Sequence, residues 1–146
     1  MRILPYLLGL TAGLGLTVQV GMNSQLRKVL QSANTAALIS FLVGTTALIA
    51  LLLATRSPLP ERATLAAVPW WAWLGGVLGA FYVASSTVVA AELGTASLLG
   101  LALAGQLATA LVIDHFGWLG MPEHPITWMR GAGVVLLASG VWLITR

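Results

Sequence analysis

The sequence predicts an all-α integral membrane protein with five transmembrane helices, in a single transmembrane domain covering residues 1–146. Two observations predict this class. First, 58% of the residues are hydrophobic and 8% are charged, whereas about a quarter of the residues in a soluble domain are charged. Second, the chain contains five apolar runs, each close to the roughly 20 residues with which a helix crosses about 30 Å of hydrocarbon.

The first two helices are separated by a short polar segment. The five helices are expected at about 4–22, 33–54, 70–91, 96–116 and 128–144. The first run is longer than the apolar part of a secretory signal and has no small-residue cleavage site before Asn23, which favours a membrane helix over a cleaved leader. Ser32 or Asn34 can cap the second helix, because their side-chain oxygens accept hydrogen bonds from the amides of the first turn.

The three remaining helices are separated by breaks of different kinds. A loop with prolines at 58, 60 and 69 precedes the third helix, which opens on the tryptophan cluster at 70–73. Tryptophan is enriched at membrane interfaces, so this cluster indicates the edge of the bilayer. A tight turn at Gly94 leads into the fourth helix, and a longer loop at 117–127 precedes the fifth.

Polar side chains inside the apolar runs are the candidate substrate-binding residues. Polar groups are costly in hydrocarbon, so each one needs a partner or a function. Gln19 and Asn23 lie four residues apart on the first helix, and Tyr82 and Ser86 are spaced in the same way on the third. Gln106 lies in the middle of the fourth. These residues are expected to line a polar cavity near the midplane, where transporters usually bind, or else to form hydrogen bonds between helices.

None of the charged residues falls at the centre of a predicted helix. A proton carrier at the midplane needs a buried titratable group, so the sequence argues against that mechanism. Glu92 and Asp114 lie at helix ends, where we expect gating or structural roles. There is no catalytic triad, phosphate-binding loop or metal motif, and the absence of cysteine excludes a thiol nucleophile. The sequence therefore predicts no enzymatic activity, no cofactor and no metal site.

The positions of the basic residues indicate how the chain is oriented in the membrane. They sit singly or in pairs at helix ends, as anchors to the lipid bilayer do, and form no nucleic-acid surface. With five spans, one side of the membrane would hold Arg2, Arg56, Arg62 and Arg130, and the other would hold Arg27, Lys28 and Arg146. A Lys and Arg excess on the cytoplasmic side normally sets orientation. A split of four to three leaves two readings open: insertion in both orientations, or a single orientation set by a small excess.

Small residues recur four positions apart on several helices. The sets are Gly9/Gly13, Ser40/Gly44, Gly75/Gly79 and Gly100/Ala104/Ala108. Such spacing lets helix backbones approach closely in a membrane. The pattern indicates close helix packing, either within one chain or between two chains.

The fourth helix also carries a recognisable motif. Gly105-Gln106-Leu107 followed by residues 113–118 (IDHFGW) resembles the GQ…DHFG signature of the YdcZ-like family of bacterial inner-membrane proteins, which is placed in the drug/metabolite transporter superfamily. Residues 19–26, 36–44 and 76–82 support the resemblance. It implies half of an inverted-repeat transporter fold, because longer members of the superfamily look like two five-helix halves in inverted orientation. Glu92 departs from the family pattern, so a role for it would be particular to this protein.

The function that the sequence and the resemblance together favour is small-molecule transport or export across the bacterial inner membrane by a homodimer. The lack of a central charge favours a neutral or amphipathic substrate over a strongly ionic one. Two alternatives stay open. A small dimeric ion channel would conduct without saturating, and a non-transporting membrane interaction protein would show neither flux nor stabilisation by a ligand.

Overall fold

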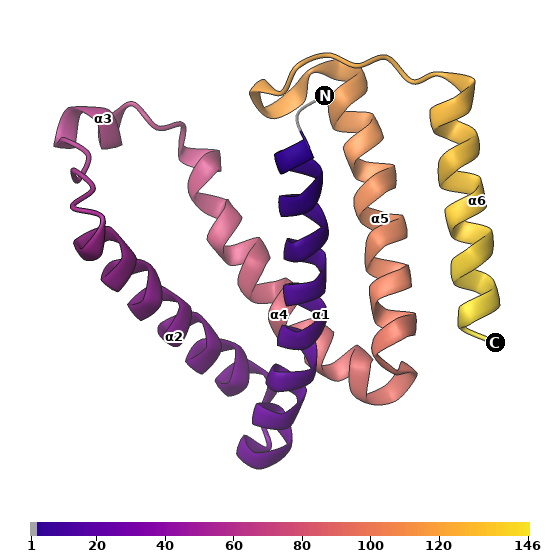
Figure 1. The fold of residues 1–146 in the computed structure, drawn as a ribbon, viewed down its shortest axis with the longest axis horizontal. Helices are drawn as coiled ribbons and strands as arrows, with labels where there is room; N and C mark the ends of the chain where they lie inside the picture. The colour runs from indigo at the N-terminus through magenta and orange to yellow at the C-terminus, as the bar shows by residue number, and fades with distance from the viewer. Residues whose placement is uncertain (1–2) are drawn as a thin grey trace. The chain divides into compact units, whose positions relative to one another are not determined.

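The computed structural model describes residues 3–146, and these residues form helices joined by short connections (Figure 1). In chain order the elements are α1 (Ile3–Leu30), α2 (Ala33–Ala54), α3 (Arg62–Ala66), the 3-10 helix η1 (Trp70–Leu74), α4 (Gly75–Leu93), α5 (Thr95–Phe116), the 3-10 helix η2 (Trp118–Gly120) and α6 (Trp128–Ile144). No strand occurs within 3–146, which confirms the all-α prediction. Arg2, counted above for orientation, lies outside the described residues.

Four helical segments are long and apolar enough to cross a membrane. They are Ile3–Leu30, Ala33–Ala54, Trp70–Leu93 and Thr95–Phe116. The apolar helix α6 has 17 residues, so at 1.5 Å per residue it is about 26 Å long, the lower limit for a spanning helix. Four of the predicted spans therefore have the required length, and the fifth stays a prediction.

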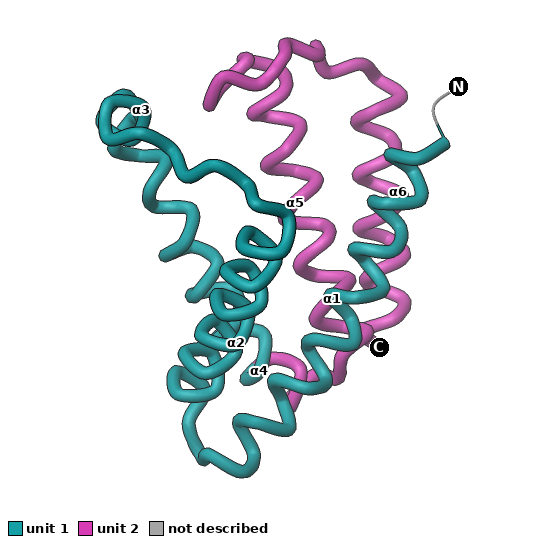
Figure 2. The backbone as a smooth tube through the Cα atoms, turned by 60° about the vertical axis from the view of Figure 1, so that its left-hand side comes forward, with its two compact units in different colours: residues 1–88 teal, residues 89–146 magenta. Residues whose placement is uncertain are grey.

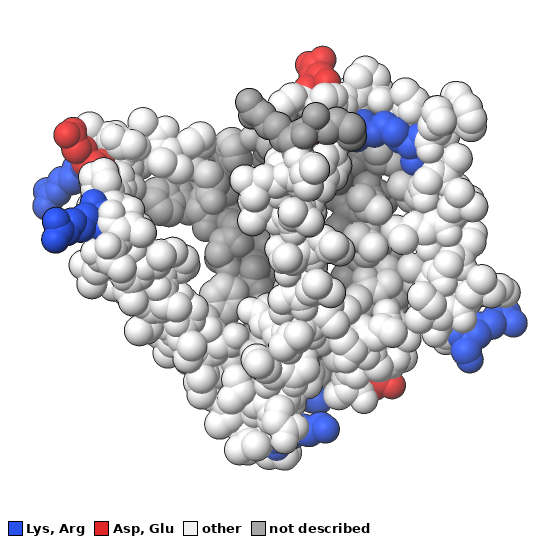
Figure 3. All heavy atoms as spheres, viewed as in Figure 1, with Lys and Arg blue, Asp and Glu red and all other residues white. Residues whose placement is uncertain are grey.

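The charged side chains mark the ends of these helices. On the face shown in Figure 3, Lys, Arg, Asp and Glu gather at helix ends and loops, and the surfaces between them are uncharged. At the end of α6, the Arg146 guanidinium lies 4.0 Å from the centre of the Trp142 ring. This cation–π pair suits a membrane interface, where tryptophan and arginine are both enriched.

The chain divides into two compact units, residues 1–88 and 89–146, which Figure 2 distinguishes by colour. In the first unit, α1 and α2 pack against each other. The helix α1 ends at Leu30 because Gln31 adopts a left-handed conformation with φ 53°, and the Gln31 side-chain amide donates to the Lys28 carbonyl at 2.6 Å. Ser32 caps α2 by accepting a hydrogen bond from the Thr35 amide at 3.2 Å, which confirms one of the two predicted caps.

Two features of this unit differ from the sequence-based expectation. The first helix was expected to end near Met22, yet α1 continues to Leu30, since residues 23–30 are mostly polar but contain no proline or glycine to break a helix. The loop after α2 also contains the short helix α3, which was not predicted. Its residues, RATLA, are mostly good helix formers that follow Pro60.

The buried residues of the first unit are few and mostly small. They are Val20 and Asn23 on α1, Ala36 and Ala37 on α2, and Val83, Ser86 and Thr87 on α4. Val20 and Asn23 lie near the end of α1, and Ala36 and Ala37 lie near the start of α2, on either side of the turn that joins these two helices. The interior of this unit is therefore built mainly of small and polar side chains.

In the second unit, α5 and α6 run antiparallel and pack side by side (Figures 1 and 2). A side-chain carbon placed on Gly100 of α5 would lie 3.1 and 3.2 Å from the two methyl groups of Val141 on α6. The missing side chain of Gly100 thus permits this close approach, as the small-residue pattern predicted. By contrast, Gly9 and Gly13 have no such neighbour within 4 Å, so that pair makes no close helix contact in the described chain.

Candidate functional site

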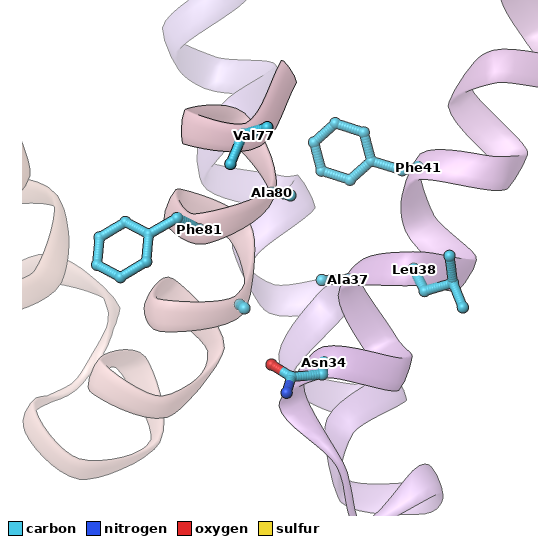
Figure 4. Close-up of a pocket in the computed structure, with 8 residues that line it drawn as sticks. Asn34, Ala37, Leu38, Phe41, Val77, Ala80 and Phe81 are labelled. Atoms are coloured by element: carbon cyan, nitrogen blue, oxygen red, sulfur yellow. The ribbon is translucent and has the colours of Figure 1, made fainter. Parts of the chain in front are cut away.

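Two hollows of the first unit lie along α2. The larger has a volume of about 580 Å³ and lies between α2 and α4 (Figure 4). Apart from Asn34 its lining is apolar, with Phe41 of α2 and Phe81 of α4 as the largest side chains. The smaller hollow, about 210 Å³, is lined by Gln19 of α1 and by residues of α2 that include Phe41. Phe41 therefore belongs to both hollows.

The two hollows differ in chemistry. The smaller one contains an amide from Gln19 and hydroxyl groups from Ser40 and Thr45, which can both donate and accept hydrogen bonds. The larger one offers mainly apolar surface and falls in the size range of small-molecule pockets, about 300–1,000 Å³. No charged side chain is among the described residues that line either hollow.

The same unit also contains buried polar groups. Asn23 is 4% exposed and Ser86 is 2% exposed. The Ser86 hydroxyl donates to the Val83 carbonyl at 2.8 Å, so its own helix satisfies it as a donor. The hydroxyl oxygens of Ser24 and Tyr82 are buried without a hydrogen-bond partner. A buried hydroxyl without a partner costs about 1–3 kcal/mol, so these two oxygens are suited to bind water or a ligand.

The structure places four of the five predicted binding residues, Gln19, Asn23, Tyr82 and Ser86, in the first unit. Gln106 belongs to the second unit, where its side chain is exposed on α5. A cavity shared by all five residues stays a prediction.

Sequence reasoning missed several residues that line the hollows or carry a buried polar group. Ser24 was read as part of a loop, although the uninterrupted helix-forming sequence after Asn23 could have indicated its place on α1. Ser40 was noted only as a small residue. Phe41 lies in a continuous apolar run, so nothing in the sequence distinguishes it.

A network of hydrogen bonds fixes the loop between α5 and α6. Nη2 of Arg130 donates to Oδ2 of Asp114 at 2.6 Å, forming an ion pair at the end of α5. Nη1 of Arg130 donates to the His124 carbonyl at 2.7 Å, and the His124 amide donates to the Asp114 carbonyl at 2.7 Å. Nδ1 of His115 accepts from the Ile126 amide at 3.2 Å. The amides of His124 and Ile126 therefore hold the loop against the end of α5.

Gly117 allows the chain to turn into this loop. It has φ 61°, a left-handed conformation that favours glycine at the end of a helix. A side-chain carbon there would also lie 2.7 Å from Cγ of Glu123, which is too close. Both the conformation and the space therefore require glycine at this position.

Glu92, the other candidate gating residue, lies in the last turn of α4, and its side chain is exposed. The chain reverses immediately afterwards at Gly94, which has φ 83°. The gating or structural roles of Glu92 and Asp114 stay predictions.

We expect Asp114→Asn to loosen the loop and change the transport rate without removing a pH-dependent step. Arg130 and Asp114 are 35% and 24% exposed, and an ion pair that solvent reaches is worth about 1 kcal/mol or less, so the variant should fold. Hydrogen exchange should become faster at residues 117–127. Glu123→Gln is the matched control, because it neutralises a carboxylate of the same loop that forms no ion pair among residues 3–146.

Flux measured against pH decides the role of Asp114. A titration near neutrality that is present in the wild type and lost in the asparagine variant would identify Asp114 as a proton-coupling site and contradict a structural role.

The sequence of the chain was compared with those of known proteins and families. Residues 4–143 match the family described as "Putative inner membrane exporter, YdcZ". The Inner membrane protein YdcZ of Escherichia coli (strain K12) is 29% identical over 140 residues, which cover 94% of this chain and 91% of that protein. No solved structure matches the chain.

Proposed function

Because the chain belongs to the YdcZ family of inner membrane exporters, we propose that it exports a small molecule as a homodimer with a polar binding cavity. The protein is a multi-pass protein of the inner membrane, with four helical segments of spanning length. We further propose that α6 is the fifth span and that one chain is half of an inverted-repeat fold of the drug/metabolite transporter type. A second copy would then supply the other half.

The observation that carries the proposal is the pair of hollows along α2. One offers hydrogen-bonding groups and the other offers apolar surface, the combination from which small-molecule sites are usually built. The buried, unpartnered hydroxyls of Ser24 and Tyr82 support it, since a bound polar group or water would satisfy them. An exporter needs a binding site of this kind inside its membrane-spanning part.

The exposed amide of Gln106 supports the homodimer. In the middle of a spanning helix this amide would face hydrocarbon, where an unsatisfied amide costs roughly 2 kcal/mol or more. A second copy that covers α5 would remove this cost. Five spans place the termini on opposite sides, and the nearly equal distribution of basic residues supports insertion in both orientations. We therefore propose that the two copies are antiparallel.

A ligand screen followed by a flux assay tests the proposal. The purified protein would be heated in the presence of varied metabolites and cations, since a ligand at 100 times its Kd stabilises the folded state by about 2.7 kcal/mol. Compounds that raise the melting temperature would then be tested for flux in proteoliposomes. We expect saturable flux of at least one of them. Flux that rises linearly with concentration would indicate a channel, and the absence of both binding and flux would indicate an interaction protein.

A further inference from the structure

We propose that the two hollows form one binding track for a neutral amphipathic molecule, and that Phe41 sets the size of the apolar body that this track accepts. The inference rests on the proposed function and names the substrate class of the same site. The polar group of the ligand would lie in the hollow of Gln19, and its apolar body would lie in the hollow of Phe81.

The spacing of residues along α2 puts both hollows on one face of that helix. Asn34 and Leu38 line the larger hollow, Thr45 and Leu48 line the smaller one, and Phe41 lines both. Successive members of this series are four or three residues apart, the spacing that aligns side chains on one side of a helix. The hollows therefore follow one another along α2, with Phe41 at their boundary.

Phe41 forms this boundary because the facing helix has no side chain at Gly79. A side-chain carbon placed on Gly79 would lie 3.4 Å from Cζ of Phe41, so the ring reaches the surface of α4. Figure 4 shows the ring extending from α2 toward Val77 and Ala80 of α4. A smaller side chain at position 41 would widen the passage between the two hollows and leave room for a larger apolar group.

The lining selects a neutral ligand. Gln19, Ser40 and Thr45 can exchange hydrogen bonds with an amide or a hydroxyl. A carboxylate or an ammonium group would lose its water shell and would find no opposite charge among the residues that line the hollows. The apolar body would contact Phe41, Val77 and Ala80.

Three probes with the same ring and different polar groups test the selection for neutral ligands. Binding of phenylacetamide, phenylacetate and 2-phenylethylammonium would be measured by equilibrium dialysis of the labelled compounds against full-length protein in lipid nanodiscs, with empty nanodiscs subtracted. We expect phenylacetamide to bind at least about tenfold more tightly than either charged probe. Each charged group would lose its water shell on binding and would gain no ion pair in the hollow. Equal binding of the charged probes, or no binding of phenylacetamide up to its solubility limit, would overturn the proposal.

A larger ring tests the role of Phe41. In Phe41→Ala, we expect the affinity for 1-naphthylacetamide relative to phenylacetamide to rise about tenfold. The reason is that the extra carbons of the naphthyl ring would be buried in the space that the Phe41 ring leaves, and a few buried carbons change affinity by about this factor. Phe41→Leu should give a smaller rise and provides a second variant if the alanine variant does not fold. Leu42→Ala is the control, because Leu42 is the next residue on α2, is 57% exposed and lines neither hollow.

The outcomes separate this proposal from the proposed function. An unchanged ratio of the two affinities in a folded Phe41 variant, or an equal change in Leu42→Ala, would overturn the role of Phe41 even where the protein transports other compounds. The expected change in the ratio, found in a protein that gives no flux with any compound, would support the binding track and count against export.

Discussion

Replacing Gln106 with leucine is expected to reduce transport sharply and to leave the protein folded in the membrane. Gln106 is exposed in the middle of α5, so leucine removes an amide that is costly in hydrocarbon and does not weaken the fold of the single chain. If Gln106 faces the binding cavity, its loss leaves a polar group of the substrate without a partner. This costs about 1–3 kcal/mol, which corresponds to a loss of between about fivefold and about 150-fold in binding.

The test measures ligand binding, flux and melting temperature on the same preparation. Gln25→Leu is the matched control, because it makes the same change at another exposed glutamine, on α1. We expect the control to transport normally. An unstable Gln106→Leu variant that still binds the ligand would instead show that Gln106 forms hydrogen bonds between helices.

Replacing Gly100 with leucine is expected to cause a large loss of stability. Even a single carbon on Gly100 would lie 3.1 Å from a methyl group of Val141, and leucine adds three more. Forcing extra carbons into a packed contact costs about 1–3 kcal/mol, so α5 and α6 should separate. Thermal unfolding in detergent should show a clearly lower melting temperature.

Gly105 provides the control on the same helix, since a side-chain carbon there would have no such neighbour within 4 Å. Gly105→Leu should leave the melting temperature nearly unchanged, and Val141→Ala should restore part of the stability of Gly100→Leu. Equal losses in the two leucine variants would contradict the packing of α5 on α6 through Gly100.

The helices could be predicted from the sequence because apolar runs of spanning length have few alternative structures. Their ends were harder to predict, and α1 shows why. Hydropathy falls at Asn23, which indicates where a helix leaves the hydrocarbon, but the backbone keeps its hydrogen bonds until Gln31 turns left-handed. The end of a membrane span and the end of a helix depend on different physical properties.

The candidate site could be predicted only in part. Gln19, which lines the smaller hollow, stood out because polar groups are conspicuous in an apolar run. Asn23, Tyr82 and Ser86 were singled out for the same reason, and their part in binding stays a prediction. The place of Phe41 depends on the missing side chain at Gly79 of a facing helix, and no local pattern in the sequence reports this pairing. The ion pair of Asp114 with Arg130 joins two residues that flank one loop, but no pattern in the sequence reports that their side chains meet.

The antiparallel homodimer is the central proposal, and cysteine labelling tests it most directly. The chain contains no cysteine, so Ser57→Cys and Thr145→Cys each introduce a single reactive site, in the loop after α2 and after α6 respectively. With five spans, these positions lie on opposite sides of the membrane. In sealed, right-side-out vesicles, a maleimide that does not cross membranes should label roughly half of the chains at either position, and the rest only after permeabilisation, if the chain inserts in both orientations. Complete labelling at one position with none at the other would show a single orientation and contradict the antiparallel dimer.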